Sequence, residues 1–155
     1  MLNSEKMRLF KAYVYDLLEI HYSTLGFMPQ DEDEEHLDIL ARIRAVEWMC
    51  KLDYDDCVHN ALEYFQAWMN LNLTIPVGFE DTVLNTAIQS GNLTWWEFLL
   101  EKFKTATLDS DKQRYVKALT RIEDASTISR LALVFLFISK EDSLKETYKH
   151  KVHVL

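Results

Sequence analysis

Glycine and proline are scarce in this chain, whose 155 residues include three Gly and two Pro. Tight hairpin turns between strands need residues with a positive φ, which Gly supplies most readily. The scarcity therefore favours helices over sheets. No stretch alternates apolar and polar residues for long enough to predict a strand. We expect an all-α fold.

Apolar residues recur at helical spacing along nearly the whole chain. The predicted helices cover about residues 4–22, 34–52, 55–71, 80–90, 94–106, 111–121, 124–139 and 143–150. About eight helices joined by short connections must run antiparallel to their neighbours. Helix pairs recur roughly every 30 to 40 residues, which is the range of helical repeats. The prediction is an α-solenoid or irregular helical array that forms one domain over residues 1–155.

The first two predicted helices carry apolar residues at helical spacing. In the first helix, the apolar residues that recur at helical spacing are Leu9, Phe10, Tyr13, Leu17 and Ile20. The second has one stripe of Leu37, Leu40, Ala41 and Trp48 and another of Ile39, Ile43, Val46 and Cys50. A helix that is apolar on two sides is expected to be covered on two sides, as inside a stack.

Several helix ends carry local signals. Thr94-x-x-Glu97 and Ser110-x-x-Gln113 have the form of capping boxes, and Asp124 or Ser126 is expected to cap the helix that follows. Gly91 is a predicted C-terminal stop. In the helix over residues 94–106 we expect Trp95 to face inward and Trp96 to contact an adjoining helix pair.

The formal net charge is −8. A nucleic-acid partner would require a basic stripe, and an anionic membrane surface also attracts positive charge, so we expect contact with neither. The longest apolar run, residues 131–138, is far shorter than the roughly 20 residues that span a bilayer. Residues 1–10 do not resemble a signal peptide. We expect a soluble chain without a signal or anchor of its own.

The sequence contains none of the motifs that usually indicate catalysis. There is no Gly-rich phosphate loop, no G-x-S-x-G, no Cys-x-x-Cys and no H-E-x-x-H among its five histidines, which are His21, His36, His59, His150 and His153. The tryptophans at helical spacing are typical of core packing rather than of a ligand cage. We therefore predict no catalytic residue, no metal ligand and no cofactor in this chain.

Cys50 and Cys57 are the two cysteines of the chain. On one continuous helix a spacing of seven residues would hold them about 10 Å apart, which is too far for a disulfide. The segment between them, which includes Asp53-Tyr54-Asp55, favours a helix break that would bring them to either side of a hairpin. The spacing alone leaves two alternatives, a disulfide and a pair of buried free thiols.

Two Asn-x-Thr sequons fall in predicted loops. They are Asn72-Leu73-Thr74 and Asn92-Leu93-Thr94. N-glycosylation requires such an acceptor at the surface of a secreted protein. Asn72 and Asn92 are therefore glycosylation candidates.

An ordered series of short motifs resembles the C-terminal helical domain of aminopeptidase N-like zinc metallopeptidases. The resemblance covers about residues 10–137 and fades after about residue 139. The motifs are Leu25-Gly26-Phe27, Leu40-x-Arg42, Cys50, Cys57, Phe65-x-x-Trp68, Ile75-Pro76, Val83-x-x-Thr86-Ala87-Ile88-x-x-Gly91, Trp96-x-Phe98-Leu99, Ala106-Thr107, Ala118-Leu119 and residues 124–131.

The resemblance implies a HEAT-like stack of helix pairs from a secreted or membrane-anchored exopeptidase. It also implies that Cys50 and Cys57 form a disulfide. A second cysteine pair that is common in the family is replaced here by Asn85 and Arg121. The loss of both partners together is what the loss of a disulfide should look like.

The family's zinc-binding and substrate-binding motifs lie in upstream domains that this sequence does not contain. The resemblance thus implies a truncated product or fragment, an accessory domain that caps the catalytic cleft and limits the entry of peptides in the parent enzyme. Its partners would be the missing catalytic domains, its location the cell surface or exterior, and zinc a cofactor of the parent only. The alternative is a free-standing helical scaffold that binds a protein partner.

Overall fold

The computed structural model describes residues 4–28, 34–134 and 136. Its helices are α1 (Ser4–Leu25), α2 (His36–Lys51), α3 (Asp55–Leu71), α4 (Glu80–Gln89), α5 (Leu93–Thr105) and α6 (Asp109–Leu119). A further helical segment covers residues 125–134. The described residues contain no strand, which confirms the all-α prediction. The helix predicted at residues 143–150 lies outside the described residues.

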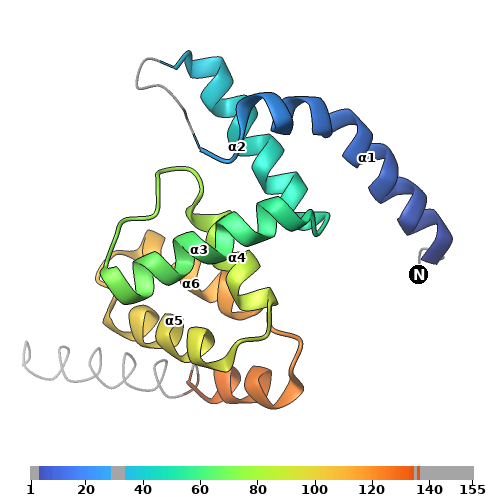
Figure 1. Cartoon of the computed structure of the whole chain (residues 1–155). Coiled ribbons are helices and arrows are strands. Elements are labelled where there is room, and N and C mark those ends of the chain that lie inside the picture. Colours follow the sequence, from blue (N-terminus) through green and yellow to red (C-terminus); the bar gives the residue numbers. More distant parts are fainter. Residues whose placement is uncertain (1–3, 29–33, 135, 137–155) are drawn as a thin grey trace, which may run out of the picture.

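Consecutive helices pack in the pairs α1–α2, α3–α4 and α5–α6 (Figure 1). Between pairs, α4 contacts both α2 and α6, so the even-numbered helices lie next to one another in order. The aromatic rings of Phe65 and Trp68 in α3 contact those of Trp95 and Phe98 in α5. Successive helix pairs therefore stack on one another, in the arrangement expected for a helical array.

The starts and ends of these helices depend on local contacts that the sequence indicated only in part. The Thr94 capping box is wrong, because α5 begins one residue earlier and Asn92 accepts a hydrogen bond from the Trp95 N–H at 3.2 Å. The Ser110 box is also wrong, since α6 begins at Asp109 after Leu108 without a side-chain cap.

Two other terminal signals are confirmed. Asp124 accepts a hydrogen bond from the Thr127 N–H at 2.7 Å and so caps the last helical segment. Gly91 has a φ of +78°, in the left-handed region, and follows α4 directly after Ser90.

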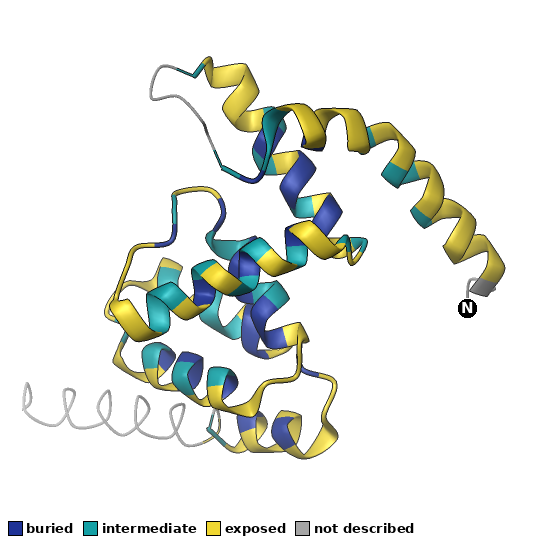
Figure 2. Cartoon of the chain, viewed as in Figure 1, coloured by how far each residue is buried: buried dark blue, intermediate teal, exposed yellow. Residues whose placement is uncertain are grey.

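The core lies between α2, α3, α4, α5 and α6, whose facing surfaces hold most of the buried side chains (Figure 2). The largest fully buried side chains are Trp96, Phe65, Met49, Leu84, Ile88, Leu99, Leu119, Val46, Val83 and Cys57. Trp95 packs against this core as predicted, whereas Trp96, which was predicted to contact an adjoining helix pair, lies within the core itself. Trp96 is fully buried and its Nε1–H donates to the Leu119 carbonyl oxygen at 3.2 Å, whereas Trp95 is half-buried.

Candidate functional site: the disulfide hairpin and the exposed α1 face

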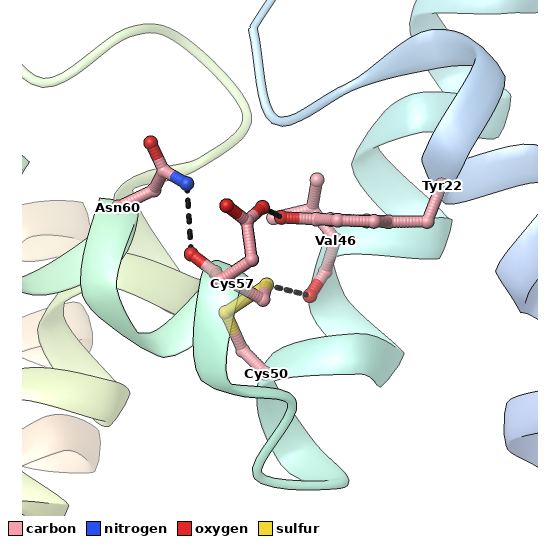
Figure 3. Close-up of a disulfide and its surroundings, with 6 residues drawn as sticks. Tyr22, Val46, Cys50, Cys57 and Asn60 are labelled. Atoms are coloured by element: carbon pink, nitrogen blue, oxygen red, sulfur yellow. Dashed lines mark hydrogen bonds between the residues drawn. A yellow bond between two sulfur atoms is a disulfide. The ribbon is translucent and has the colours of Figure 1, made fainter.

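Cys50 lies near the end of α2 and Cys57 in the first turn of α3, and the two are joined by a disulfide (Figure 3). Their α-carbons are 5.2 Å apart, within the limit of about 7 Å that a bridge requires. Asp53 adopts a φ of +62° in the turn between them. The prediction of a disulfide at the tip of a helix hairpin is confirmed in the structure.

Tyrosine side chains connect α1 to this hairpin. The Tyr54 ring contacts those of Tyr15 and Tyr22, with centroids 5.6 and 5.4 Å apart. The Tyr22 hydroxyl donates to Asp56 Oδ2 at 2.7 Å, at the start of α3. Burial, together with this hydrogen bond, raises the pKa of Tyr22 well above its ordinary value, so the hydroxyl keeps its proton. The end of α1 is thereby held against the start of α3.

Arg42 supplies a second connection between α1 and α2. Its side chain is buried, and its Nε–H donates to the Leu25 carbonyl oxygen at the end of α1 at 2.8 Å. Its two terminal nitrogens pair with both carboxylate oxygens of Glu34. The sequence analysis did not single out this pair. The available signal was an Arg one helical turn before Val46, in line with the stripe that is buried, where a charge needs a partner.

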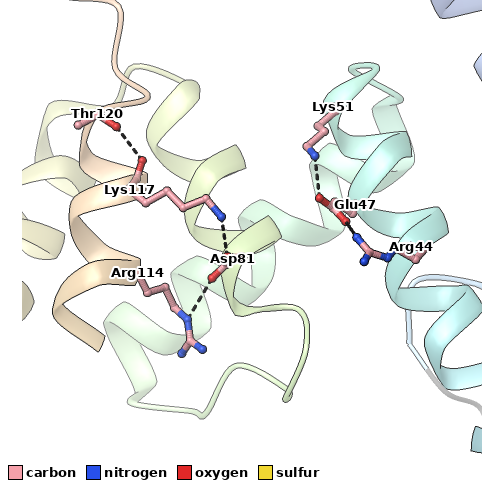
Figure 4. A network of polar contacts seen from close by, with 7 residues as sticks. All are labelled: Arg44, Glu47, Lys51, Asp81, Arg114, Lys117 and Thr120. Atoms are coloured by element: carbon pink, nitrogen blue, oxygen red, sulfur yellow. Dashed lines mark hydrogen bonds and ion pairs between the residues drawn. The ribbon is translucent and has the colours of Figure 1, made fainter. Parts of the chain in front are cut away.

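A surface network of polar contacts joins α4 to α6 (Figure 4). Asp81 accepts hydrogen bonds from Arg114 Nε at 3.0 Å and from Lys117 Nζ at 2.9 Å. Burial alone would raise the pKa of Asp81, but the hydrogen bond and charge of Lys117, and those of Arg114, hold it below its ordinary value. This arrangement joins helices, and we assign no chemical step to it.

Asn85 and Arg121, the two positions at which the resembling family carries further cysteines, line one pocket of about 190 Å³ between α2, α4 and the end of α6. They share it with Cys50, Lys51 and Lys117 among others. Two positions that replace a bonded pair are expected to lie close together in this way.

The α1 face is the apolar stripe formed by Leu9, Phe10, Tyr13, Leu17 and Ile20, and all five side chains are exposed. Their helical spacing therefore does not place these side chains in the core. Most of the α1 ribbon has the colour of exposed residues in Figure 2. The core side of α1 is instead the stripe that includes Tyr15, Leu18 and Tyr22. Both stripes have helical spacing, and only the position of α2 decides which of them is covered.

The second helix was expected to be covered on both sides, which is wrong for one of them. Val46 and Cys50 of one stripe are buried, whereas Leu37, Leu40 and Trp48 of the other are exposed. The first helix pair thus presents uncovered apolar surface on both of its helices. Monomeric soluble proteins rarely expose contiguous apolar surface of more than a few hundred Å², and larger patches usually mark interaction sites.

The two sequons differ in their surroundings. Asn72 is exposed and follows α3 with a φ of +53°, a left-handed conformation that Asn tolerates. Asn92 is exposed too, but its side chain caps α5, and Thr94 of its sequon lies within that helix.

Among the residues that the structure describes, no three His, Cys, Asp or Glu side chains are grouped so that they could hold a metal ion. Within the same ranges, no helix combines the length and apolar character needed to cross a membrane.

Comparison with known proteins gives the class of this fold. The profile of the ERAP1-like C-terminal domain family matches residues 1–152, and the chain belongs to this family. It is 28% identical to glutamyl aminopeptidase of Bos taurus over 146 residues, 94% of this chain and 14% of that protein. It is also 28% identical to glutamyl aminopeptidase of Bitis rhinoceros over 136 residues, which are 87% of this chain and 13% of that protein.

A third relative is the thyrotropin-releasing hormone-degrading ectoenzyme of Rattus norvegicus, 25% identical over 135 residues, 82% of this chain and 12% of that protein. The chain thus spans about one seventh or less of the length of these relatives. The chain corresponds to one domain of much larger aminopeptidases, as the sequence motifs predicted.

Proposed function

We propose that this chain is the accessory C-terminal domain of a larger zinc-dependent aminopeptidase, in which it caps the catalytic cleft and limits which peptides enter. The observation that carries the proposal is the family match over residues 1–152, together with relatives that are aminopeptidases several times longer. Residues 1–155 act as a single helical domain in this proposal. The partners of the domain are the catalytic domains of the parent, and peptides are the substrates of that parent.

The α1 face supports this proposal. Its exposed aromatic and aliphatic side chains, and the exposed Leu37 and Leu40 in α2, are apolar groups that another part of a larger protein would cover. The change Ile20→Gln tests this role, since that side chain is 71% exposed. We expect it to leave the unfolding of the isolated chain unchanged but to weaken the attachment of the domain in the parent, measured as faster proteolytic release.

Zinc would belong to the catalytic part of the parent, where it activates the water that attacks the peptide bond. The isolated chain, with or without added zinc, should therefore release no amino acid from aminoacyl chromogenic substrates. Zinc-dependent turnover that persists through repurification would contradict this expectation.

The proposed location is the outside of the cell, with Asn72 and Asn92 as glycosylation candidates. The buried disulfide between Cys50 and Cys57 supports this location, because such bridges persist in oxidising compartments. The α1 face would equally suit a second candidate, a free-standing scaffold that binds a protein partner. Thiol titration of the protein from its native source separates the two, since a cytosolic scaffold should carry two free thiols.

The decisive experiment has two parts. The full transcript should encode an H-E-x-x-H motif upstream of Met1. Removal of residues 1–155 from the encoded enzyme should then raise the hydrolysis of long peptides relative to dipeptide-sized substrates, because the cleft is uncapped. A transcript without that motif, or an unchanged preference for peptide length, would refute the accessory-domain proposal.

A further inference from the structure

The sequon at Asn72 lies beside a pocket. Asn72 and Thr74 both contribute to the wall of a cavity of about 280 Å³, with Trp68 of α3, Leu84 of α4 and Tyr115 of α6. Residues 72–76 are neither helix nor strand, and the side chain of Asn72 makes no hydrogen bond to the described residues. The Asn72 side chain is therefore available for modification at the edge of this cavity.

The composition of the cavity suits a sugar. Trp68 and Tyr115 supply half-buried aromatic rings with centroids 6.2 Å apart, and the buried Ile75 and Leu84 add apolar surface. Glu80 and Arg114 line it too and supply charged hydrogen-bonding groups. A cavity of about 280 Å³ is near the lower end of the roughly 300–1,000 Å³ typical of small-molecule sites, which suits one sugar ring.

The sequon at Asn92 serves as an internal comparison. Its Asn side chain already accepts a hydrogen bond from the Trp95 N–H, and Thr94 lies inside α5. Neither residue lines the cavity beside Asn72. Any effect that depends on the cavity should therefore be confined to Asn72.

We propose that Asn72 carries an N-linked glycan whose first N-acetylglucosamine occupies the cavity between Trp68, Tyr115 and Arg114. This inference rests on the extracellular location in the proposed function. In the modification, Asn72 Nδ2 attacks C1 of a lipid diphosphate-linked oligosaccharide in the secretory pathway. The bond from C1 to the diphosphate oxygen breaks, the lipid diphosphate leaves with the electron pair, and Nδ2 loses one proton.

The test uses the full chain, secreted from eukaryotic cells behind a cleavable signal, as wild type and as the variants Thr74→Ala and Thr94→Ala. Each variant removes one sequon and keeps its Asn, so the turn after α3 and the cap of α5 are retained. Site occupancy is measured by mass spectrometry, and thermal unfolding is followed for the intact glycan and after trimming to a single sugar. The same three chains made without glycosylation in bacteria are the control.

We expect glycan on Asn72 and a melting temperature that falls by about 2 to 4 °C in secreted Thr74→Ala, as loss of one aromatic contact would produce in a domain of this size. Trimming wild type to one sugar should preserve its melting temperature. Thr94→Ala should not lower it, and the bacterial proteins should show no difference between wild type and Thr74→Ala. Adding Tyr115→Ala should abolish the effect of Thr74→Ala, as a double-mutant cycle requires.

A secreted chain that is unmodified at Asn72 would overturn the proposal. So would a glycan there whose removal leaves the melting temperature unchanged, or whose effect survives Tyr115→Ala. These outcomes are separate from the accessory-domain proposal, which depends on the upstream motif and on the peptide-length preference of the parent.

Discussion

The helices α1 and α5 have similar apolar patterns but opposite environments. The longer of them, α1, has 22 residues, and among its described side chains only that of Tyr22 is buried. The shorter, α5, has 13 residues and buries Trp96, Leu99, Leu100 and Phe103. The difference lies in their neighbours, since α5 lies against α3, α4 and α6, whereas α1 packs mainly on α2. An apolar stripe stabilises a fold only where another element covers it.

The comparison also suggests a division of roles. Burial in α5 and the helices around it provides most of the core, while α1 packs on α2 and is attached by specific side-chain contacts to α2 and to the hairpin that follows it. Those contacts are the Lys11–Asp53 ion pair, the Tyr22–Asp56 hydrogen bond, the Arg42–Leu25 hydrogen bond and the tyrosine cluster at the disulfide hairpin. The α1 face is left available for a partner.

The largest expected effect compares one substitution in the two helices. Leu99→Ala should lower the free energy of unfolding by about 4 kcal/mol, since the Leu99 side chain is fully buried and its loss leaves a cavity. Leu17→Ala in α1 is the matched control and should change it by less than about 0.5 kcal/mol, since Leu17 is 55% exposed. Urea denaturation measures both. Similar losses of unfolding free energy in the two variants would mean that α1 is covered in the isolated chain, and α1 and α5 would then not differ in burial.

The second prediction concerns how α1 is attached. Arg42→Ala should lower the free energy of unfolding by about 3 kcal/mol. This is the lower end of the range for breaking a buried ion pair, because Glu34 lies nearer the surface and can regain water. Amide hydrogen exchange should accelerate in α1 more than in α5. Arg44→Ala is the control, since its ion pair with Glu47 is exposed and contributes little. Equal acceleration in the two helices would show that they unfold as one unit.

The third prediction concerns the disulfide between α2 and α3. The double variant Cys50→Ala/Cys57→Ala should have a free energy of unfolding about 2 to 3 kcal/mol lower than that of the wild type. This is the value that the chain-entropy model gives for a loop this short. Wild type unfolded in the presence of a reducing agent should show a similar loss. We expect exchange protection to fall first in α1 and α2, because the bridge connects this pair to the rest of the chain. Loss of protection beginning in α5 would contradict this order.

The smallest effect concerns the charge network between α4 and α6. The pKa of Asp81 is lowered in the folded state, so its contribution to stability is present above its unfolded value of about 3.8 and is lost as the pH falls through the lower folded value. Asp81→Asn should therefore flatten the acid side of the pH dependence of unfolding, and the change in the free energy of unfolding should be less than about 1 kcal/mol because the partners are partly exposed.

The variant Glu47→Gln allows the pH dependence of unfolding in the first helix pair to be compared with that of the network around Asp81. The pKa of Glu47 is lowered by hydrogen bonds and charges from Lys51 and Arg44, on its own helix. Its effect has the same sign but acts within α2 rather than between helices. A larger pH effect from Glu47 than from Asp81 would place the main acid sensitivity in the first pair.

The sequence by itself determined the helical class, the approximate positions of the described helices and the hairpin that holds Cys50 and Cys57. These features depend on interactions within one or two helical turns, such as the left-handed stop at Gly91 and the cap by Asp124, and local sequence encodes them directly. The family motifs also follow from residue order alone, and they predicted the family that the profile match confirmed.

Only the tertiary structure decided which face of each helix is covered. The sequence analysis did not place Trp96 in the core or identify Tyr15, Leu18 and Tyr22 as the covered side of α1, because more than one set of apolar residues on a helix has helical spacing. Likewise, Arg42 meets Leu25 and Glu34, and Asp81 meets Lys117, only after the helices pack. The cavity beside Asn72 requires side chains from α3, α4 and α6 at once. Burial and charge pairing are non-local, and the pattern of one segment does not specify the neighbour that completes it.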